Sequence, residues 1–264
     1  MKNFLVIGNP IKHSLSPKLH NYWLKKNNLN GIYNKKMLNE EDIREVILGV
    51  KNDQIHGINV TVPFKRKVIP FLDKLSFEAE QSQSVNTIYK ENDKIIGHNT
   101  DIAGFELAIR HIKYDLKDKK VFILGAGGVV SSIVLALIKM KVYKIYISNR
   151  TKEKALNLKK YFKNLEIIDW GIITDFDMII NATSLGLNKE EEIKIDYKNI
   201  GSNKFFYDVI YNPKQTIFLK NAKKYGNKIE NGKMMFIYQA HQSFTIWNKI
   251  MPKIDEETIK LLDD

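Results

Sequence analysis

Short apolar runs of strand length alternate along the chain with longer segments whose apolar residues recur at helical spacing. Apolar residues at 43, 46, 47 and 50 predict a helix that residues 39–42 start. Alternation of strands with helices is typical of parallel sheets that are joined by helical crossovers. The first strands are predicted at residues 4–7, 32–38 and 57–62.

The same patterns predict the remaining elements. Residues 84–89 and 94–97 fit a hairpin around the polar turn 91–93. Ser16 is predicted as the N-cap of a helix that extends to residue 27, and Pro63 is predicted to open another helix. Later helices are predicted at 102–112, 129–140, up to about 162, 214–225, 233–249 and 255–262, and later strands at 121–124, 142–147, 165–168, 178–181 and 205–210.

The stretch from Val121 to Lys154 carries the first recognisable chemistry. A strand-length apolar run leads into the turn Gly125-Ala126-Gly127-Gly128, and a helix-length segment and a second strand follow. Glycines at such a turn let a pyrophosphate approach the first N–H groups of the helix. Val130 stands where the usual G-x-G-x-x-G pattern has its third glycine, so the match is partial. A doubly wound strand whose turn binds nothing is the alternative interpretation.

The end of the second strand of this unit indicates which dinucleotide is bound. An NAD site usually has Asp or Glu there to hold the ribose 2′-hydroxyl, whereas this chain has Asn149, Arg150 and Thr151, with Lys154 close behind. A carboxylate would repel a 2′-phosphate, and a guanidinium, a hydroxyl and an ammonium would bind one. The residues therefore predict NADP as the cofactor.

Composition narrows the classes of protein that fit. A length of 264 residues allows one or two domains, and the absence of cysteine excludes disulfides, thiolate metal sites and a cysteine nucleophile. No pair of histidines has a metal-ligand spacing, so no metal is predicted. No apolar run is long enough for a membrane span, and no signal-peptide h-region follows Met1, so a cytoplasmic location is expected.

The net charge of +12 raises the question of nucleic-acid binding. Only four of the 42 basic residues are arginine, and the lysines are spread along the chain without interleaved stacking aromatics. We therefore expect no nucleic-acid partner. The positive field suits anionic small molecules such as NADPH and a carboxylate substrate.

Polar residues concentrate at the predicted strand ends of the first half, in residues 14–17, 59–65, 84–87 and 97–101. Ligands of open α/β sheets bind at such strand ends. Hydride transfer to a carbonyl leaves an alkoxide, which needs a proton donor or a cation nearby.

Five further segments follow these four along the chain. They are the glycine turn, Asn149-Arg150-Thr151, residues 181–184, residues 208–213 and Gln239-Ala240. In that order, and over essentially its full length, the chain resembles the shikimate dehydrogenase family. The resemblance implies NADP-dependent, reversible reduction of 3-dehydroshikimate to shikimate in the pathway to aromatic amino acids. It also implies an α/β substrate-binding domain, residues 1–101, that the C-terminal helices within 236–264 complete, and a Rossmann-type NADP-binding domain, residues 102–235.

The resemblance also assigns residues to roles. Lys65 and Asp101 match the family's catalytic pair, and sequence does not decide which of them transfers the proton. Ser14 and Ser16 match its carboxylate-binding hydroxyls, and Tyr211 is expected near the same carboxylate. Asn59, Thr61, Asn86 and Gln239 match the groups that bind the substrate hydroxyls. The cofactor contacts map to Gly125, Ala126, Gly127, Gly128, Asn149, Arg150, Thr151, Val209 and Gly232, and Lys154 takes a place where many relatives have arginine.

Several of these residues also fit local structural roles. Ser16 and Thr61 suit N-caps, Asn86 suits a turn, and Lys65 alone would pass for a solvated lysine. Two other functions stay open at this point. One is a quinate or quinate/shikimate dehydrogenase that uses NAD or NADP, and the other is a non-catalytic NADP-binding regulator. A homodimer also stays open.

Overall fold

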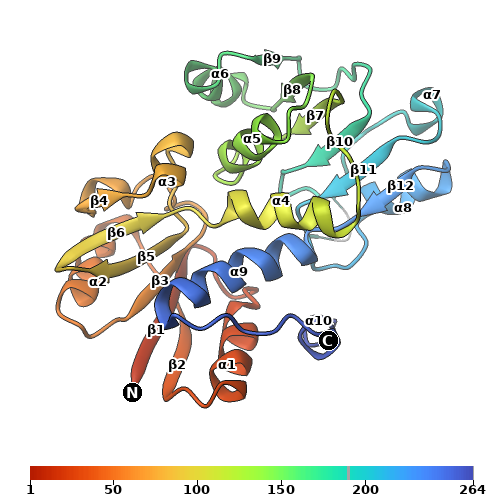
Figure 1. The fold of residues 1–264 in the computed structure, drawn as a ribbon. Helices are drawn as coiled ribbons and strands as arrows, with labels where there is room; N and C mark the ends of the chain where they lie inside the picture. Colours follow the sequence, from red (N-terminus) through yellow and green to blue (C-terminus); the bar gives the residue numbers. More distant parts are fainter. Residues whose placement is uncertain (189–190, 264) are drawn as a thin grey trace. The chain divides into compact units, whose positions relative to one another are not determined.

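The computed structural model of the protein describes residues 1–188 and 191–263. Within them the chain forms two compact units. Unit 1 contains Met1–Gly104 and Ile237–Asp264, and unit 2 contains Phe105–Phe236. Figure 1 shows a sheet with flanking helices in each unit, so the predicted α/β class is confirmed. None of the helices in the described ranges is both long and apolar enough to cross a lipid bilayer.

Unit 1 is built on a six-stranded mixed sheet with the order β2-β1-β3-β5-β6-β4. Strand β1 (Lys2–Gly8) pairs in parallel with β2 (Gly31–Met37) and with β3 (Gly57–Val60). The predicted hairpin is β5 (Thr87–Glu91) and β6 (Lys94–His98), and β5 runs antiparallel to β3. The edge strand β4 (Lys74–Leu75) is only two residues long. The carboxyl ends of β1 and β3 therefore meet at one edge of the sheet.

Each face of this sheet buries a different set of side chains. On β3, Ile58 and Val60 join an aliphatic core with residues of α2 (Ile43–Lys51). The apolar residues of α2 that predicted this helix, at positions 43, 46, 47 and 50, are all buried. Side chains alternate along a strand, so Gly57 and Asn59 point to the opposite face. That face is covered by α1 (Ser16–Lys26) and by the part of α9 (Lys233–Asn248) that belongs to unit 1. A short helix, α10 (Glu256–Lys260), follows.

Two predictions for unit 1 are wrong. No helix opens at Pro63: residues 62–68 form turns, and a short 3-10 helix, η2 (Ile69–Phe71), follows them. The apolar residues Phe64 and Val68 reach the aliphatic core from these turns, which explains why the segment resembled a helix in sequence. Ser16 is the first residue of α1 and not its N-cap, which is Leu15. The short helix α3 (Phe77–Ser82), the 3-10 turn η1 (Glu40–Asp42) and β4 were not predicted.

Unit 2 is a six-stranded parallel sheet with the order β12-β11-β10-β7-β8-β9. Its strands are β7 (Lys120–Leu124), β8 (Lys144–Ser148), β9 (Leu165–Ile167), β10 (Met178–Asn181), β11 (Phe205–Asp208) and β12 (Lys228–Glu230). In order of appearance this is 3-2-1-4-5-6 read from β9, the order of a Rossmann sheet. The chain reverses direction across the sheet between β7 and β10, which is where such sheets bind dinucleotides.

The helices of unit 2 lie between these strands in sequence, as Figure 1 shows. They are α5 (Val130–Lys139), α6 (Lys152–Tyr161), the short α7 (Tyr197–Ile200) and α8 (Ile217–Lys224), and α4 (Asp101–His111) leads into the unit. Phe122, Phe176 and Phe206 form the centre of the core on one face of the sheet. The central strands are buried throughout, as expected of parallel strands covered on both faces.

Candidate active site

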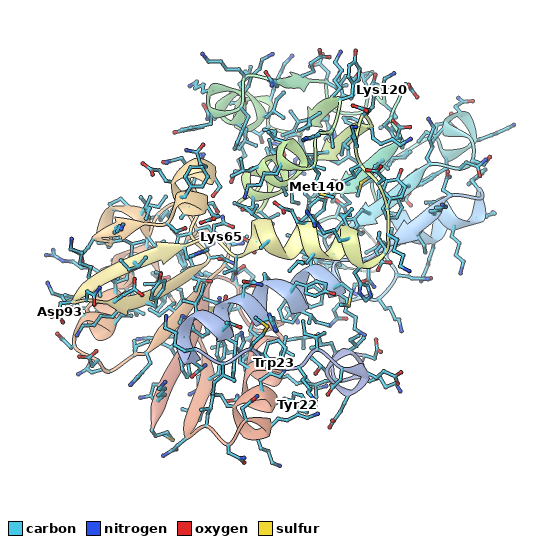
Figure 2. All side chains as sticks on the ribbon, in the orientation of Figure 1. Tyr22, Trp23, Lys65, Asp93, Lys120 and Met140 are labelled. Carbon is cyan, nitrogen blue, oxygen red and sulfur yellow. The ribbon has the colours of Figure 1, made fainter. Side chains whose placement is uncertain are left out.

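Lys65 and Asp101 form a buried ion pair in unit 1. The Lys65 ammonium donates to Asp101 Oδ2 at 2.5 Å, and the two residues are only 8% and 5% exposed. Asp101 is the first residue of α4, and Figure 2 shows Lys65 beside the start of that helix. Burial of a charge is costly unless a partner neutralises it. The geometry therefore assigns Lys65 a specific carboxylate and excludes the solvated lysine that its sequence position alone allows.

Neighbouring groups hold both members of the pair in place. Asn99 Oδ1 accepts the backbone N–H groups of Asp101 and Ile102 at 3.0 and 3.3 Å, which caps the start of α4. A carboxylate at a helix N-terminus is favoured by the helix dipole. On the other side, Lys65 O accepts the Val85 N–H at 2.8 Å, so the turn that carries Lys65 is fastened to the segment before β5.

Asn86 joins the ion pair to a second candidate residue. Its Nδ2 donates to Asp101 Oδ1 at 3.0 Å, to Thr100 Oγ1 at 2.8 Å and, at 3.3 Å, to Gln239 Oε1. Its Oδ1 accepts the Thr100 backbone N–H at 2.8 Å. Four residues predicted from separate parts of the sequence, Lys65, Asn86, Asp101 and Gln239, therefore share one hydrogen-bonded cluster.

Asn59 supports this cluster through a hydrogen bond to Asn86. Its Nδ2 lies within 3.1 Å of Asn86 O and 2.9 Å of Ser243 Oγ, and its Oδ1 accepts the Tyr33 hydroxyl at 2.7 Å. The residue is 6% exposed. An amide nitrogen has two hydrogens, and the Asn59 hydrogens already have protein acceptors.

The predicted hydroxyl residues of unit 1 lie at the carboxyl ends of β1 and β3. Ser14 is half-buried in the loop after β1, and its Oγ accepts the Ser16 N–H at 3.3 Å. Thr61 follows β3, and its N–H donates to Ile7 O at 2.9 Å. Because no helix begins at Pro63, Thr61 has no helix to cap and its hydroxyl serves no such role.

In unit 2 the glycine turn has the geometry that a phosphate cradle requires. Gly125 follows β7 directly with a φ of +111°, and a Cβ there would lie 2.7 Å from Ala182 O. Gly127 is exposed, and a Cβ on it would meet only Ala182 O at 3.9 Å. Helix α5 starts after the turn without a side-chain cap and without an acidic residue in its first turn. These features fit an anion at the start of α5.

The predicted 2′-phosphate residues lie between β8 and α6 and on the first turn of α6. Arg150, Thr151 and Lys154 are exposed, and Asn149 Nδ2 donates to Thr151 O at 2.8 Å, which closes the turn around Arg150. At the position of the missing third glycine, Val130 is fully buried as the first residue of α5. The packing of α5 against the sheet therefore accommodates valine at that position.

The last predicted residues of unit 2 lie beyond β11 and β12. A Cβ on Gly232 would lie 2.0 Å from Val209 O, so the two predicted residues are in direct backbone contact and Gly232 admits no side chain. The ring of Tyr211 stacks on Phe236 with centroids 4.6 Å apart. Asp208, which ends β11, is fully buried, and burial raises the pKa of its carboxyl to about 6. Its oxygens accept from Asn181 Nδ2, the Ile210 N–H and Thr216 Oγ1.

Comparison with known proteins decides the family. Residues 6–88 match the profile of the shikimate dehydrogenase substrate binding domain, and residues 106–214 match that of shikimate / quinate 5-dehydrogenase. The shikimate dehydrogenase (NADP(+)) of Pelagibacter ubique strain HTCC1062 is 63% identical over 262 residues, which are 99% of each chain. The chain belongs to the shikimate dehydrogenase family. The resemblance inferred from the sequence is thereby confirmed.

Solved structures of shikimate dehydrogenases share the fold along the whole chain. The enzyme of Aquifex aeolicus superposes with a TM-score of 0.91 at 36% identity and covers 99% of this chain and 97% of its own. The shikimate 5-dehydrogenase of Thermus thermophilus, solved in complex with NADP(H) and shikimate, gives a TM-score of 0.89 at 29% identity and covers 100% and 98%. The two-domain α/β architecture of this shikimate dehydrogenase family member is therefore confirmed.

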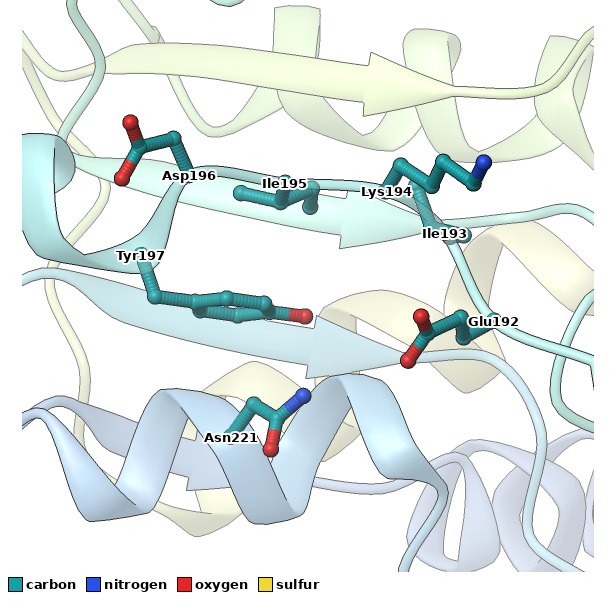
Figure 3. Close-up of a pocket in the computed structure, with 7 residues that line it drawn as sticks. All are labelled: Glu192, Ile193, Lys194, Ile195, Asp196, Tyr197 and Asn221. Atoms are coloured by element: carbon teal, nitrogen blue, oxygen red, sulfur yellow. The ribbon is translucent and has the colours of Figure 1, made fainter.

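A separate hollow of 390 Å³ lies on unit 2, lined by residues 192–197 and by Asn221 of α8 (Figure 3). Figure 3 shows the Tyr197 ring between the two sides of the hollow, with Glu192 and Asn221 near its hydroxyl end. Burial raises the pKa of the Tyr197 hydroxyl above its usual range. The lining residues include none of the predicted site residues, so this hollow is distinct from the positions that the family resemblance assigns.

Sequence reasoning missed the residues that support the site. Thr87, Asn99, Thr100 and Ser243 are at most 1% exposed and are hydrogen-bonded within the cluster around Asn86. In unit 2, the sequence indicates Asn181 and Asp208 only as members of the segments 181–184 and 208–213. Thr87, Thr100 and Asn99 stand beside predicted site residues, a signal that could have found them. Ser243 is linked to the site only through the tertiary structure.

Proposed function

We propose that the protein catalyses the NADP-dependent, reversible reduction of 3-dehydroshikimate to shikimate. The observation that carries the proposal is the buried Lys65–Asp101 pair, with Asn86 and Gln239 bonded around it, in a chain that belongs to the shikimate dehydrogenase family. When bound, NADPH supplies the hydride for reduction and NADP⁺ accepts it in the reverse direction. The protein supplies binding, orientation and the proton.

In this proposal, Lys65 and Asp101 act together on one proton. During reduction the carbonyl oxygen of the substrate gains negative charge, and an N–H of the Lys65 ammonium stabilises it and supplies a proton. Asp101 Oδ2 holds Lys65 through the 2.5 Å hydrogen bond, and its carboxylate accepts a hydrogen bond from the adjacent substrate hydroxyl. Both residues thus take part in the proton transfer. Because the pair is buried, competing water is kept away from the reacting oxygen.

The other candidate residues would bind the rest of the substrate. We propose that the hydroxyls of Ser14, Ser16 and Tyr211 bind its carboxylate, since hydroxyl groups donate well to anionic oxygen. Thr61, Asn86 and Gln239 would bind its ring hydroxyls. Asn59 completes the assigned set, and we propose that it supports Asn86, whose carbonyl oxygen accepts from Asn59 Nδ2 at 3.1 Å.

For the cofactor, we propose that the turn Gly125-Ala126-Gly127-Gly128 holds the pyrophosphate at the start of α5. Arg150, Thr151 and Lys154, with Asn149 shaping their turn, would hold the 2′-phosphate that distinguishes NADP from NAD. Val209 and Gly232 form a close-packed backbone contact that would border the nicotinamide end. The fit rests on the uncapped start of α5 and on the space above Gly127.

The test is an assay of the purified protein with shikimate or quinate and with NADP or NAD, followed by the absorbance of the reduced nicotinamide. We expect the fastest turnover with shikimate plus NADP. Absence of turnover with that pair would exclude the proposed activity. Protein carrying Lys65→Ala, prepared in parallel, controls for contaminating dehydrogenases from the expression host.

The same assay decides between the two alternatives. Faster oxidation of quinate with NAD would identify a quinate dehydrogenase of the same family. NADP binding without turnover of either substrate would identify a regulator, although a regulator has no need of the buried Lys65–Asp101 pair. We also propose that the protein is cytoplasmic and that it forms a homodimer. Cell fractionation would test the location, and light scattering would test the oligomeric state.

A further inference from the structure

One stripe of α9 faces the sheet of unit 1. Gln239, Ser243 and Trp247 are four residues apart, so they lie above one another on the same side of the helix. Gln239 contacts Asn86 of the candidate active site, and Trp247 contacts the sheet at the other end of the stripe. The stripe therefore connects the substrate-binding cluster with a structural anchor.

The anchor is an aromatic contact of close fit. The Trp247 indole stacks on Phe4 with centroids 5.2 Å apart, and its Nε1 donates to Ile88 O at 3.2 Å. A Cβ on Gly57 would lie 2.4 Å from the indole ring, so the helix approaches β3 as closely as a glycine allows. This contact sets the height of α9 above the sheet at one end.

Ser243 is the next contact of the stripe, and it is polar. The residue is fully buried, and its Oγ lies 2.9 Å from Asn59 Nδ2, 2.8 Å from Thr87 Oγ1 and 3.2 Å from Thr100 Oγ1. It also lies 3.1 Å from Gln239 O, one turn earlier on α9. A hydroxyl offers one donor and two acceptor sites, so these partners use all of its hydrogen-bonding capacity.

The partners of Ser243 lead to the candidate active site by short routes. Thr100 Oγ1 accepts from Asn86 Nδ2 at 2.8 Å, and the same Nδ2 donates to Asp101 Oδ1 at 3.0 Å. Asn59 Nδ2 reaches Asn86 O at 3.1 Å. One buried hydroxyl thus fixes the segment before β5, the start of α4 and the turn of α9 that carries Gln239.

We propose that Ser243 is a positioning residue for substrate binding, which holds Asn86 and Gln239 in the arrangement that recognises the substrate hydroxyls. This inference rests on the proposed function. Ser243 does not touch the substrate itself, because its hydroxyl is enclosed by Asn59, Thr87 and Thr100. Loss of the hydroxyl would loosen both amides while leaving the Lys65–Asp101 ion pair in place.

The test is Ser243→Ala, assayed with shikimate and NADP. We expect the KM for shikimate to rise about tenfold, since hydrogen bonds of this kind contribute on the order of the free energy of one decade in affinity. The KM for NADP should stay within about twofold, because unit 2 carries the proposed cofactor residues. A purely structural role would lower the melting temperature and leave the ratio of the two KM values unchanged.

The matched control is Thr245→Val on the same helix. Thr245 Oγ1 bonds His241 O, one turn earlier, at 2.8 Å, the same kind of local bond that Ser243 makes to Gln239. We expect wild-type KM values for this variant. An equal rise of the shikimate KM in both variants would overturn the inference, because general loosening of α9 would then be sufficient.

A second variant decides the question if Ser243→Ala fails to fold. Ser243→Cys keeps a side chain of similar size but replaces the hydroxyl by a thiol, which is a weak hydrogen-bond donor and acceptor. A raised shikimate KM with an unchanged KM for NADP in this variant supports the inference, and an unchanged shikimate KM overturns it. Failure of the proposed function is separate: wild-type protein would then not turn over shikimate at all.

Discussion

A lysine is rarely buried unless a carboxylate neutralises it, because desolvation of an ammonium group is costly. Lys65 meets this condition through Asp101, and Asn86 donates to the second oxygen of the same carboxylate. Such an arrangement is a weak source of stability, since desolvation offsets most of the attraction. Its value lies in a charged group that is held in one position for chemistry.

Substitution of Lys65 by alanine should therefore affect catalysis far more than cofactor binding. We expect kcat to fall by roughly 10²–10⁴, because a positioned proton donor contributes about that factor. NADP affinity, measured by titration calorimetry, should be unchanged. Lys67→Ala, in the same turn but exposed, is the control and should keep kcat near the wild-type value. A nearly normal kcat for Lys65→Ala would remove Lys65 from the mechanism.

Arg150 should distinguish NADP from NAD. Arg150→Ala removes the guanidinium proposed to hold the 2′-phosphate, so NADP affinity should fall by roughly 10–100-fold, as expected for a charged hydrogen bond. NAD, which lacks that phosphate, should lose less than about threefold. Arg110→Ala, an exposed arginine on α4, is the control. Equal losses for both cofactors in calorimetric titrations would show that Arg150 does not recognise the 2′-phosphate.

Residues that resemble a family motif could be predicted from the sequence, because their types and order carry the signal. Lys65, Asn86, Asp101 and Gln239 were identified in this way, and the structure brings them together. Ser243 could not be identified, because a serine inside an amphipathic helix has no distinctive local pattern. Its three cross-contacts depend on how α9 lies over the sheet, which is a property of the folded unit.

Among the elements of unit 1, β3 and α9 meet at a glycine. Gly57→Ala would place a methyl group 2.4 Å from the Trp247 indole, so the helix or the strand must shift. We expect a loss of about 1–3 kcal/mol in the free energy of unfolding, which is typical of overpacking, and a raised KM for shikimate because α9 carries Gln239. Urea denaturation and steady-state kinetics would measure the two effects.

Gly31→Ala is the matched control for that variant. It lies on β2 of the same sheet, where a Cβ would lie 3.2 Å from Lys2 O, a much milder approach than the 2.4 Å at Gly57. We expect a smaller loss of stability and an unchanged KM for shikimate. If Gly57→Ala kept both its stability and its KM, the close packing of α9 would have no bearing on the site.

Long, strongly patterned elements were predictable, and short ones were not. Strands β7, β8, β9, β10 and β11 of unit 2 and helix α2 follow from their apolar patterns, whereas the three-residue strand β12 was not predicted. Strand β4 has two residues and α7 four, lengths at which the pairing partner and not the local sequence determines the conformation. The prediction of a helix at Pro63 was wrong for a related reason. Phe64 and Val68 are four residues apart, which fits a helix, but the turns at residues 62–68 also bring both side chains into the core.

On the scale of the whole molecule, the aromatic side chains that join the two segments of unit 1 surround a histidine. The His20 ring stacks on Tyr33 with centroids 4.3 Å apart and lies against Trp23, Phe244 and Trp247. Neither ring nitrogen has a hydrogen-bond partner within the described part of the chain. Burial without a partner lowers the pKa of His20 to about 3. The folded protein therefore keeps this ring neutral at neutral and mildly acidic pH.

This burial predicts a loss of stability in acid. The folded pKa lies below the unfolded value near 6.5, so between those values the unfolded chain binds a proton that the folded chain does not. The free energy of unfolding should decrease, through this residue alone, by about 1.4 kcal/mol per pH unit as the pH falls below about 6.

His20→Phe tests this prediction, because phenylalanine keeps the stacking and cannot titrate. Urea denaturation at several pH values between 7 and 4.5 should show wild-type protein losing stability faster than the variant. Asp208, whose pKa is raised to about 6 by burial, changes stability in the opposite sense and is present in both proteins, so it cancels in the comparison. Parallel curves for the two proteins would exclude His20 as a source of acid sensitivity.

The layout of the whole molecule was only partly predictable. Alternating patterns predicted α/β units, but the return of the last helices to unit 1 followed from the family resemblance alone. In the structure, Ile237–Asp264 belongs with the first 104 residues, and the aromatic cluster around His20 takes members from both segments. Contacts of such sequence separation leave no periodic signal in the chain.

The two-segment construction of unit 1 also determines the order in which a ribosome can complete the protein. Unit 2 is one continuous segment, so it can fold once residue 236 and a short stretch behind it have been synthesised. Until Phe244 and Trp247 emerge, β1, α1 and β2 present Phe4, Trp23 and Tyr33 without the rings that cover them. The nascent chain thus exposes these aromatic side chains through most of its synthesis. Exposed apolar surface promotes aggregation, so this is the stage at which chaperones would protect the chain most.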